Sequence, residues 1–231
     1  MGPRPVPAPP CPEKPDFNTV RERMAAAALH EIGPAGAGEE AAALGMALGL
    51  AAHWSGRTGL IWAGEEAAFA EEGAPYPAGL AQFGIDPEHL LVIRARRREE
   101  ALWAAEQGLA IAGAVVLCAL GAQGKPLDLK ATRRLLLTAE RNGSRCLLLK
   151  PEDAPTAAWT RWRVEAASSR GVGRELGAPV FRATLTRNRA GPAGQSFVLE
   201  WNAHERAFRE LALDLAAASG DRSADPVRRR A

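Results

Sequence analysis

One segment of the sequence has the residue spacing of a phosphate-binding loop. The run GPAGAGEE places Gly33 and Gly38 at the two glycine positions of the pattern G-x-x-x-x-G-K-[ST]. In that pattern, backbone N–H groups surround the phosphates of a nucleotide, a lysine reaches the β and γ phosphates, and a hydroxyl binds Mg²⁺. The chemistry that such a loop would serve is nucleotide binding and phosphoryl transfer.

Two carboxylates stand where that chemistry needs a cation and a hydroxyl. Glu39 occupies the lysine position and Glu40 the hydroxyl position. Two unit charges about 4 Å apart interact by about 4 kcal/mol at an effective dielectric constant near 20, so replacing the cation by an anion turns attraction for a triphosphate into repulsion of similar size. Glutamates also suit a helix N-terminus without any ligand, which makes a plain strand-to-helix turn the alternative interpretation.

The acid that would support Mg²⁺ is also missing from the sequence. The apolar run AVVLCAL reads as a buried strand, and it ends in Cys118 and Ala119 with no carboxylate before Asp128. The four histidines are dispersed, and none has a carboxylate or cysteine at metal-ligand spacing. We therefore expect no enzymatic activity, no cofactor and no metal centre.

Helical and strand-like segments alternate around this loop. The sequence predicts helices over residues 18–29, 38–53, 98–111, 128–143 and 156–168, with strands at LHEI, GLIWA, LLVIR, GAVVLCAL and RCLLLK. VFRATLTR and QSFVLEW read as a closing hairpin, although QSFVLEW also loosely resembles a peptide that binds the sliding clamp. The predicted fold is α/β, with a mostly parallel sheet, helices on both of its faces and a C-terminal antiparallel hairpin.

Length and composition indicate a single folded domain. We expect a disordered proline-rich lead at 1–16, the domain at 17–218 and a disordered basic tail at 219–231. A formal net charge of +2 argues against binding of nucleic acid through the overall charge of the protein. No apolar run reaches the roughly 20 residues that span a bilayer, and three distant cysteines argue against a disulfide framework, so a cytoplasmic location is expected.

Two surface segments are candidates for binding. Arg187 and Arg189 lie in TRNRAG at the end of the predicted hairpin strand, where they could contact DNA phosphates or simply form a charged turn. In the first helix, Val20, Met24 and Ala28 would share one face. That face could dock on a partner or fold back on the protein's own core.

The order of the sequence blocks resembles that of the ImuA family, which is RecA-related. The resemblance rests on LHEIGPAGAGEEAAALGMALGLA, GLIWA, YPAGLAQFGIDPEHLLVIRA, EALWAAEQGLAIAGAVVLCAL, LDLKATRRLLLTAERNGSRCLLLK, TRWRVEAASS and RATLTRNRAG followed by FVLEW. It covers about Leu29 to Trp201. The resemblance implies a RecA-like core with a degenerate phosphate-binding loop.

The same resemblance implies a role in DNA damage. ImuA proteins are accessory factors of induced translesion synthesis that work with ImuB, an inactive Y-family polymerase relative, with RecA, and indirectly with an error-prone polymerase α subunit. The alternative is a SulA-like protein. SulA is a cell-division inhibitor that blocks FtsZ assembly, and it looks like another shortened RecA relative without a phosphate loop. In RecA-type proteins a water-activating glutamate lies near the place of Glu65 and Glu66, which here read as solvated residues of a first helical turn.

Overall fold

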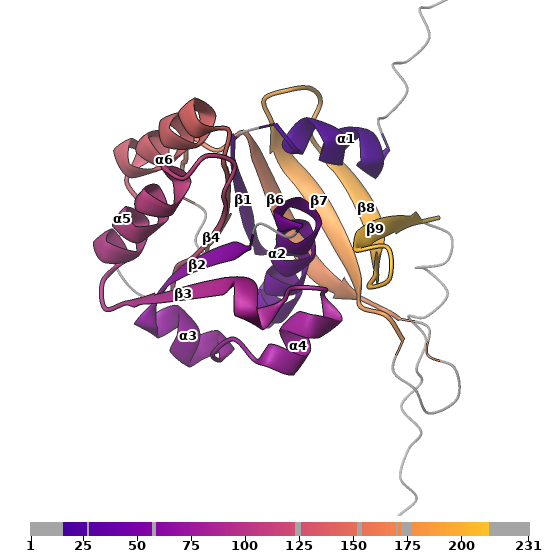
Figure 1. Ribbon diagram of the computed structural model, residues 1–231. Helices are drawn as coiled ribbons and strands as arrows, with labels where there is room; N and C mark the ends of the chain where they lie inside the picture. The colour runs from indigo at the N-terminus through magenta and orange to yellow at the C-terminus, as the bar shows by residue number, and fades with distance from the viewer. Residues whose placement is uncertain are drawn as a thin grey trace, which may run out of the picture.

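A nine-stranded sheet organises the part of the chain that the structure describes (Figure 1). The structure is a computed structural model, and it describes residues 16–26, 28–56, 59–122, 126–151, 154–169, 171 and 177–212. The strand order is β3-β2-β4-β5-β1-β6-β7-β8-β9. The predicted lead and tail therefore lie outside the described residues, apart from Asp16, and so does the predicted domain end at 218.

The first six strands run parallel and the last three antiparallel. The parallel strands are β1 (Ala28–Pro34), β2 (Leu60–Glu65), β3 (Leu90–Ala95), β4 (Val115–Ala119), β5 (Arg145–Leu149) and β6 (Thr160–Ala167). The antiparallel strands are β7 (Val180–Asn188), β8 (Gln195–Asn202) and β9 (Ala207–Leu211). The mostly parallel sheet and the closing β7–β8 hairpin are confirmed, while β9 was not predicted.

Helices cover both faces of the sheet, as predicted. The helices are α1 (Phe17–Met24), α2 (Glu40–Ser55), α3 (Glu66–Glu72), α4 (Pro77–Gln82), α5 (Arg98–Leu109) and α6 (Leu129–Asn142), with a 3-10 turn at Pro87–His89. One apolar core joins α1 and α2 to the sheet, and a second joins α5 and α6 to its other face. None of the described helices is long and apolar enough to cross a membrane.

Local signals fixed the ends of α6. Asp128 accepts a hydrogen bond from the backbone N–H of Lys130 at 3.0 Å, which satisfies one of the free donors of the first turn. Gly143 ends the helix in the left-handed conformation, with φ of 64°. The two capping residues are the first and last residues of the range predicted for this helix, 128–143.

The small residues of α2 set how closely this helix approaches the sheet. A Cβ on Gly45 would lie 2.8 Å from Cζ of Phe181, and one on Gly49 would overlap the ring of Phe208. The helix therefore packs its backbone directly against aromatic side chains of β7 and β9. Any larger residue at these two positions would push the helix away from the core.

The helix predicted over 156–168 is wrong, because residues 160–167 form β6. Thr160, Trp162 and Val164 are buried, whereas the residues between them are only partly buried. This period of two is the pattern of a strand with one face on the core. The alternation of buried and partly buried residues, and not a helical period, describes this segment.

The interpretation of the first helix as a docking face is corrected by the structure. Val20 and Met24 are buried in the protein's own core, together with Phe17, which makes edge-to-face contacts with Trp162, Phe197 and Phe208. Ala28 does not share their face, because it begins β1 and belongs to the core on the other side of the sheet. The alternative, that this helix folds back on its own domain, is the one observed.

The tryptophans and the clamp-like segment divide between core and surface. Phe197, Leu199 and Trp201 are buried, so QSFVLEW is a core strand rather than an exposed clamp-binding peptide. Trp162 is buried as expected, and Trp159 is half-buried. Trp103 is 61% exposed.

Replacing Met24 by alanine tests the packing of α1. Met24 is 1% exposed, so Met24→Ala should lower the free energy of unfolding by about 2–5 kcal/mol through lost burial and a residual cavity. Urea denaturation followed by circular dichroism measures this change. The exposed Glu22→Ala on the same helix serves as the control and should stay within about 0.5 kcal/mol. Equal effects of the two substitutions would contradict the packing.

Buried His30 predicts a pH dependence of stability. Its Nδ1 lies 2.9 Å from Oγ1 of Thr160, and burial lowers its pKa to about 4 from an ordinary value of 6.5. The unfolded chain binds this proton at higher pH than the folded chain. Neutral His30 therefore adds about 3 kcal/mol to the free energy of unfolding above about pH 6.5. This stabilisation is lost as the pH falls towards 4.

Comparing variants isolates the histidine. His30→Gln should flatten the dependence of the unfolding free energy on pH between about pH 7 and 4.5, relative to the unmodified protein. The exposed His204→Gln should leave that slope unchanged. The same slope in all three proteins would disprove the assignment to His30.

Candidate functional site

The segment Gly33 to Glu39 joins the end of β1 to the start of α2. Gly33 is the last but one residue of the strand, and a Cβ there would overlap Nη1 of Arg163 and lie 2.7 Å from the carbonyl oxygen of Lys150. Gly38 has φ of 87°, a conformation that side chains disfavour. Both glycines therefore serve a backbone that turns tightly from strand to helix, as the spacing predicted.

The carboxylate in the lysine position is part of the loop's own structure. Glu39 Oε2 accepts a hydrogen bond of 2.7 Å from the backbone N–H of Ala166 on β6. A lysine could not replace this contact, because an ammonium group only donates. Glu40 is the first residue of α2, where the partial positive charge of the helix N-terminus favours an anion.

Lys150, whose backbone lies beside Gly33, contacts a buried carboxylate. Lys150 and Glu31 are both fully buried, with Nζ of the lysine 3.4 Å from Oε1 of the glutamate. Arg161 Nε lies 2.9 Å from the same oxygen, and Thr156 Oγ1 donates to Oε2 at 2.6 Å. Lys150 Nζ also donates to the carbonyl of Ala154 at 3.2 Å. This cluster neutralises charges that would be costly to bury alone.

Glu65 is a structural residue, which corrects the expectation that it is solvated. It is the last residue of β2 and is buried. Its Oε2 accepts a 2.7 Å hydrogen bond from the backbone N–H of Gly121 and lies 3.4 Å from Nε of Arg98. Arg98 in turn donates to the carbonyl of Gly121 at 2.7 Å, so the two side chains join β2, α5 and the segment after β4. Glu66 is exposed and pairs with Arg94, as a solvated residue would.

The end of β4 presents a neutral thiol. Cys118 is completely buried, and burial raises its pKa to about 12. A thiol in this state is not a ligand for Mg²⁺, which prefers oxygen. Within the described part of the chain, no three His, Cys, Asp or Glu side chains gather as a metal site would require.

A comparison with solved structures assigns the fold. The chain is similar to the crystal structure of the RadB recombinase, with a TM-score of 0.53 and 14% identity over 81% of this chain and 92% of that one. The chain has a RecA-like fold. No family model and no curated protein matches the sequence. At this identity the similarity concerns the fold, so the finer resemblance to ImuA stays a prediction.

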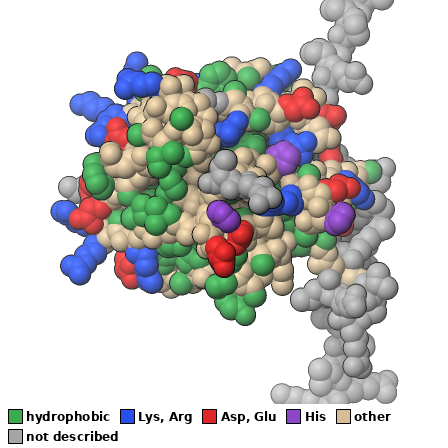
Figure 2. All heavy atoms as spheres, in the orientation of Figure 1, with side chains coloured by type: hydrophobic (Ala, Val, Ile, Leu, Met, Phe, Trp, Pro, Cys, Tyr) green, Lys and Arg blue, Asp and Glu red, His purple; other side chains and the backbone are tan. Residues whose placement is uncertain are grey.

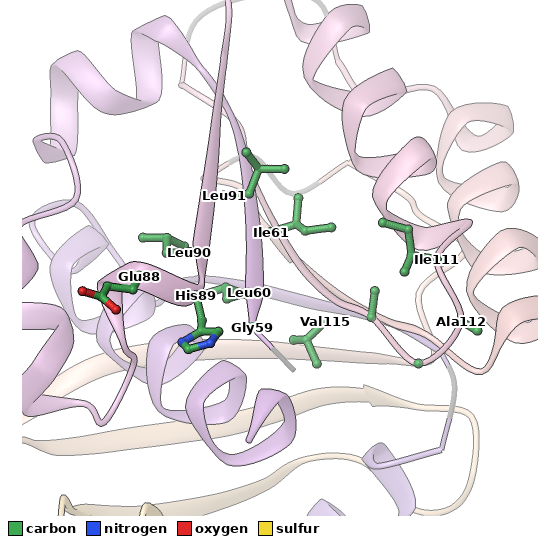
Figure 3. A pocket seen from close by; sticks show the side chains of 12 residues that line it. Gly59, Leu60, Ile61, Glu88, His89, Leu90, Leu91, Ile111, Ala112 and Val115 are labelled. Atoms are coloured by element: carbon green, nitrogen blue, oxygen red, sulfur yellow. The ribbon is translucent and has the colours of Figure 1, made fainter. Parts of the chain in front are cut away.

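In a RecA-like fold the phosphate loop lies at the carboxyl edge of the parallel strands, where open α/β sheets bind their ligands. A hollow of about 310 Å³ lies instead at the opposite edge, around the amino ends of β2, β3 and β4. Figure 3 shows Ile61, Leu91 and Ile111 on one side of it and Glu88 and His89 on the other. This hollow gathers no charges that would suit a nucleotide.

The two hairpin arginines lie on the other side of β6 from the phosphate loop and at a different point along this strand. Arg187 pairs with Arg161 near the start of β6, whereas Gly33 pairs with Arg163 further along the same strand. Arg187 is half-buried and its Nη1 donates to the carbonyl of Thr156 at 2.7 Å, and Arg189 is exposed. The structure therefore separates the two sites that the sequence singled out, and contact with DNA stays a prediction.

The loop geometry predicts that the protein does not bind ATP with Mg²⁺. Equilibrium dialysis with labelled ATP measures this, and micromolar binding would contradict it.

We also expect Glu39→Lys combined with Glu40→Thr to show no phosphate release above the unmodified protein. The substitutions remove the bond to Ala166, and no carboxylate at the end of β4 is present to support the metal.

Proposed function

We propose that this chain is a non-catalytic accessory protein of DNA-damage-induced translesion synthesis that works by binding other proteins. The observation that carries the proposal is the hydrogen bond between Glu39 and Ala166, which gives the catalytic lysine position of a RecA-like fold a structural task. A domain of this kind keeps the shape of an ATPase and offers its surface for association. Its proposed location is the cytoplasm.

The exposed apolar side chains support a role in protein binding. Of the six large hydrophobic residues that are most exposed in the described chain, five lie on β3, on α5 and just after it, or on α6: Leu91, Trp103, Ile111, Leu129 and Leu137. Figure 2 shows hydrophobic side chains gathered over the region of α5 and β3, with Lys and Arg around them. Such gathering is typical of association surfaces.

The proposed partners follow from the resemblance to ImuA. They are an ImuB-type inactive polymerase relative and RecA, with the error-prone α subunit bound indirectly through the first of these. The RecA-like fold is compatible with this role and equally with that of a SulA-like protein that blocks FtsZ assembly. The partner therefore has to be identified directly.

Purified proteins provide the test. The chain should bind the ImuB-type relative in size-exclusion chromatography. Its affinity should be the same with and without ATP and Mg²⁺, because we expect a loop with Glu39 bonded to Ala166 not to bind nucleotide. Binding to FtsZ in place of the polymerase relative would overturn the proposal in favour of division control. A nucleotide-dependent affinity would contradict the non-catalytic role.

A further inference from the structure

A groove of about 520 Å³ lies between α6 and the end of β7. Its size falls within the range of about 300–1,000 Å³ that is common for ligand-binding clefts. The layer of α5 and α6 covers the parallel part of the sheet and ends here, beside the segment that connects β5 to β6. Pro155, Thr156 and Ala157 of that segment form its floor together with Leu136.

The apolar part of the groove is open to solvent. Leu129 is 53% exposed and Leu137 is 49% exposed, and both belong to α6. They are separated by two turns of the helix, with Arg133 midway, so all three lie on one face. Two leucines presented in this way would be stabilised by covering them with apolar side chains of another molecule.

The charged part of the groove is strongly basic. Arg133, Arg187 and Arg189 line it, against a single acidic residue, Glu140. Glu140 already accepts a hydrogen bond of 3.0 Å from the indole N–H of Trp159. Arg133 and Arg189 form no ion pair within the described residues, so their charges are available to a ligand.

The backbone holds two of these arginines in place. The bond from Arg187 to the Thr156 carbonyl fixes one edge of its guanidinium, and the backbone N–H of Arg189 donates to the carbonyl of Trp159 at 2.9 Å. The groove is thus assembled from α6, the β5–β6 connection and the end of β7, and it needs no large rearrangement to accept a ligand. The guanidinium of Arg187, already held on one edge, loses little entropy when it binds a carboxylate.

We propose that this groove binds a short acidic segment of a partner protein that carries apolar side chains between its carboxylates. The inference rests on the proposed function, because it names a surface through which an adaptor would hold its partner. The arginines of the groove would pair with the carboxylates of this segment, and the two exposed leucines would pack against its apolar side chains. The chain's own C-terminal sequence, DPVRRRA, has the same sign of charge as the groove and does not complement it.

Single-stranded nucleic acid fits this surface less well. Its bases are usually bound by stacking on aromatic side chains, and none of the residues that line the groove is aromatic. Leucines beside the arginines would leave phosphates next to apolar surface. An acidic peptide satisfies both halves of the groove at once.

Fluorescence anisotropy with a synthetic peptide tests the proposal. The probe is a fluorescein-labelled peptide of about 12 residues with leucines at helical spacing among aspartates and glutamates. Arg133→Glu combined with Arg189→Glu should weaken its binding about tenfold or more, through lost attraction and new repulsion. Leu129→Ser combined with Leu137→Ser should weaken it by a similar factor, and thermal melts confirm that both variants are folded.

Matched controls make the test specific. Arg96→Glu reverses an exposed arginine just after β3 and should change the affinity less than about twofold. Equal binding of the peptide to the unmodified protein and to both groove variants would overturn the proposal, as would no binding at all. Displacement of the peptide by oligo-dT, with oligo-dT binding lost in the arginine variant, would identify a nucleic-acid site instead.

A second arm separates this inference from the proposed function. The same variants are tested against the purified ImuB-type relative. If that protein binds the unmodified chain and the groove variants equally, the groove is not its binding site, and the proposed adaptor role is retained. If it does not bind the unmodified chain although the peptide binds in the groove, the groove is a binding site for acidic segments and the proposed function is wrong.

Discussion

The rest of the structure depends on the burial of Glu31 in the middle strand of the sheet. Its carboxylate contacts Lys150 directly after β5, Arg161 on β6 and the hydroxyl of Thr156 in the connection between the two strands. No helix occupies the described part of this connection, and these polar contacts hold it against the sheet together with the burial of Ala157 and Ala158. Its path then decides where Arg187 is anchored, and thereby the shape of the groove beside α6.

The phosphate loop shows how a fold can keep its backbone while its chemistry changes. The two glycines still allow the tight passage from β1 to α2, since their task concerns sterics and not the ligand. Glu39 now joins this turn to β6, and Glu65 joins β2 to the segment after β4. Acidic groups at the carboxyl edge therefore stabilise the domain, and the surface that we propose for protein binding lies on the α5–α6 layer.

Much of the fold could be predicted because its signals are local. The phosphate-loop spacing, the caps of α6 and the buried β4 strand all follow from neighbouring residues. The helix predicted over 156–168 was wrong because residues 160–164 alternate between buried and partly buried with a period of two, as in a strand. Glu65 appeared solvated because its partners, Arg98 and Gly121, are distant in sequence. The groove could not be predicted for the same reason, since it joins 129–140 to 155–157 and 187–189.

The position of β1 has a consequence for the order in which the chain folds during synthesis. This early strand pairs with β5 and β6, and the backbone N–H of Phe17 donates to Glu210, 193 residues away. Contacts of such long range form late and slowly. The sheet can therefore close around residues 17–34 only after residues 145–210 have been synthesised. Until then the apolar surfaces of α1 and β1 are exposed to solvent and to chaperones.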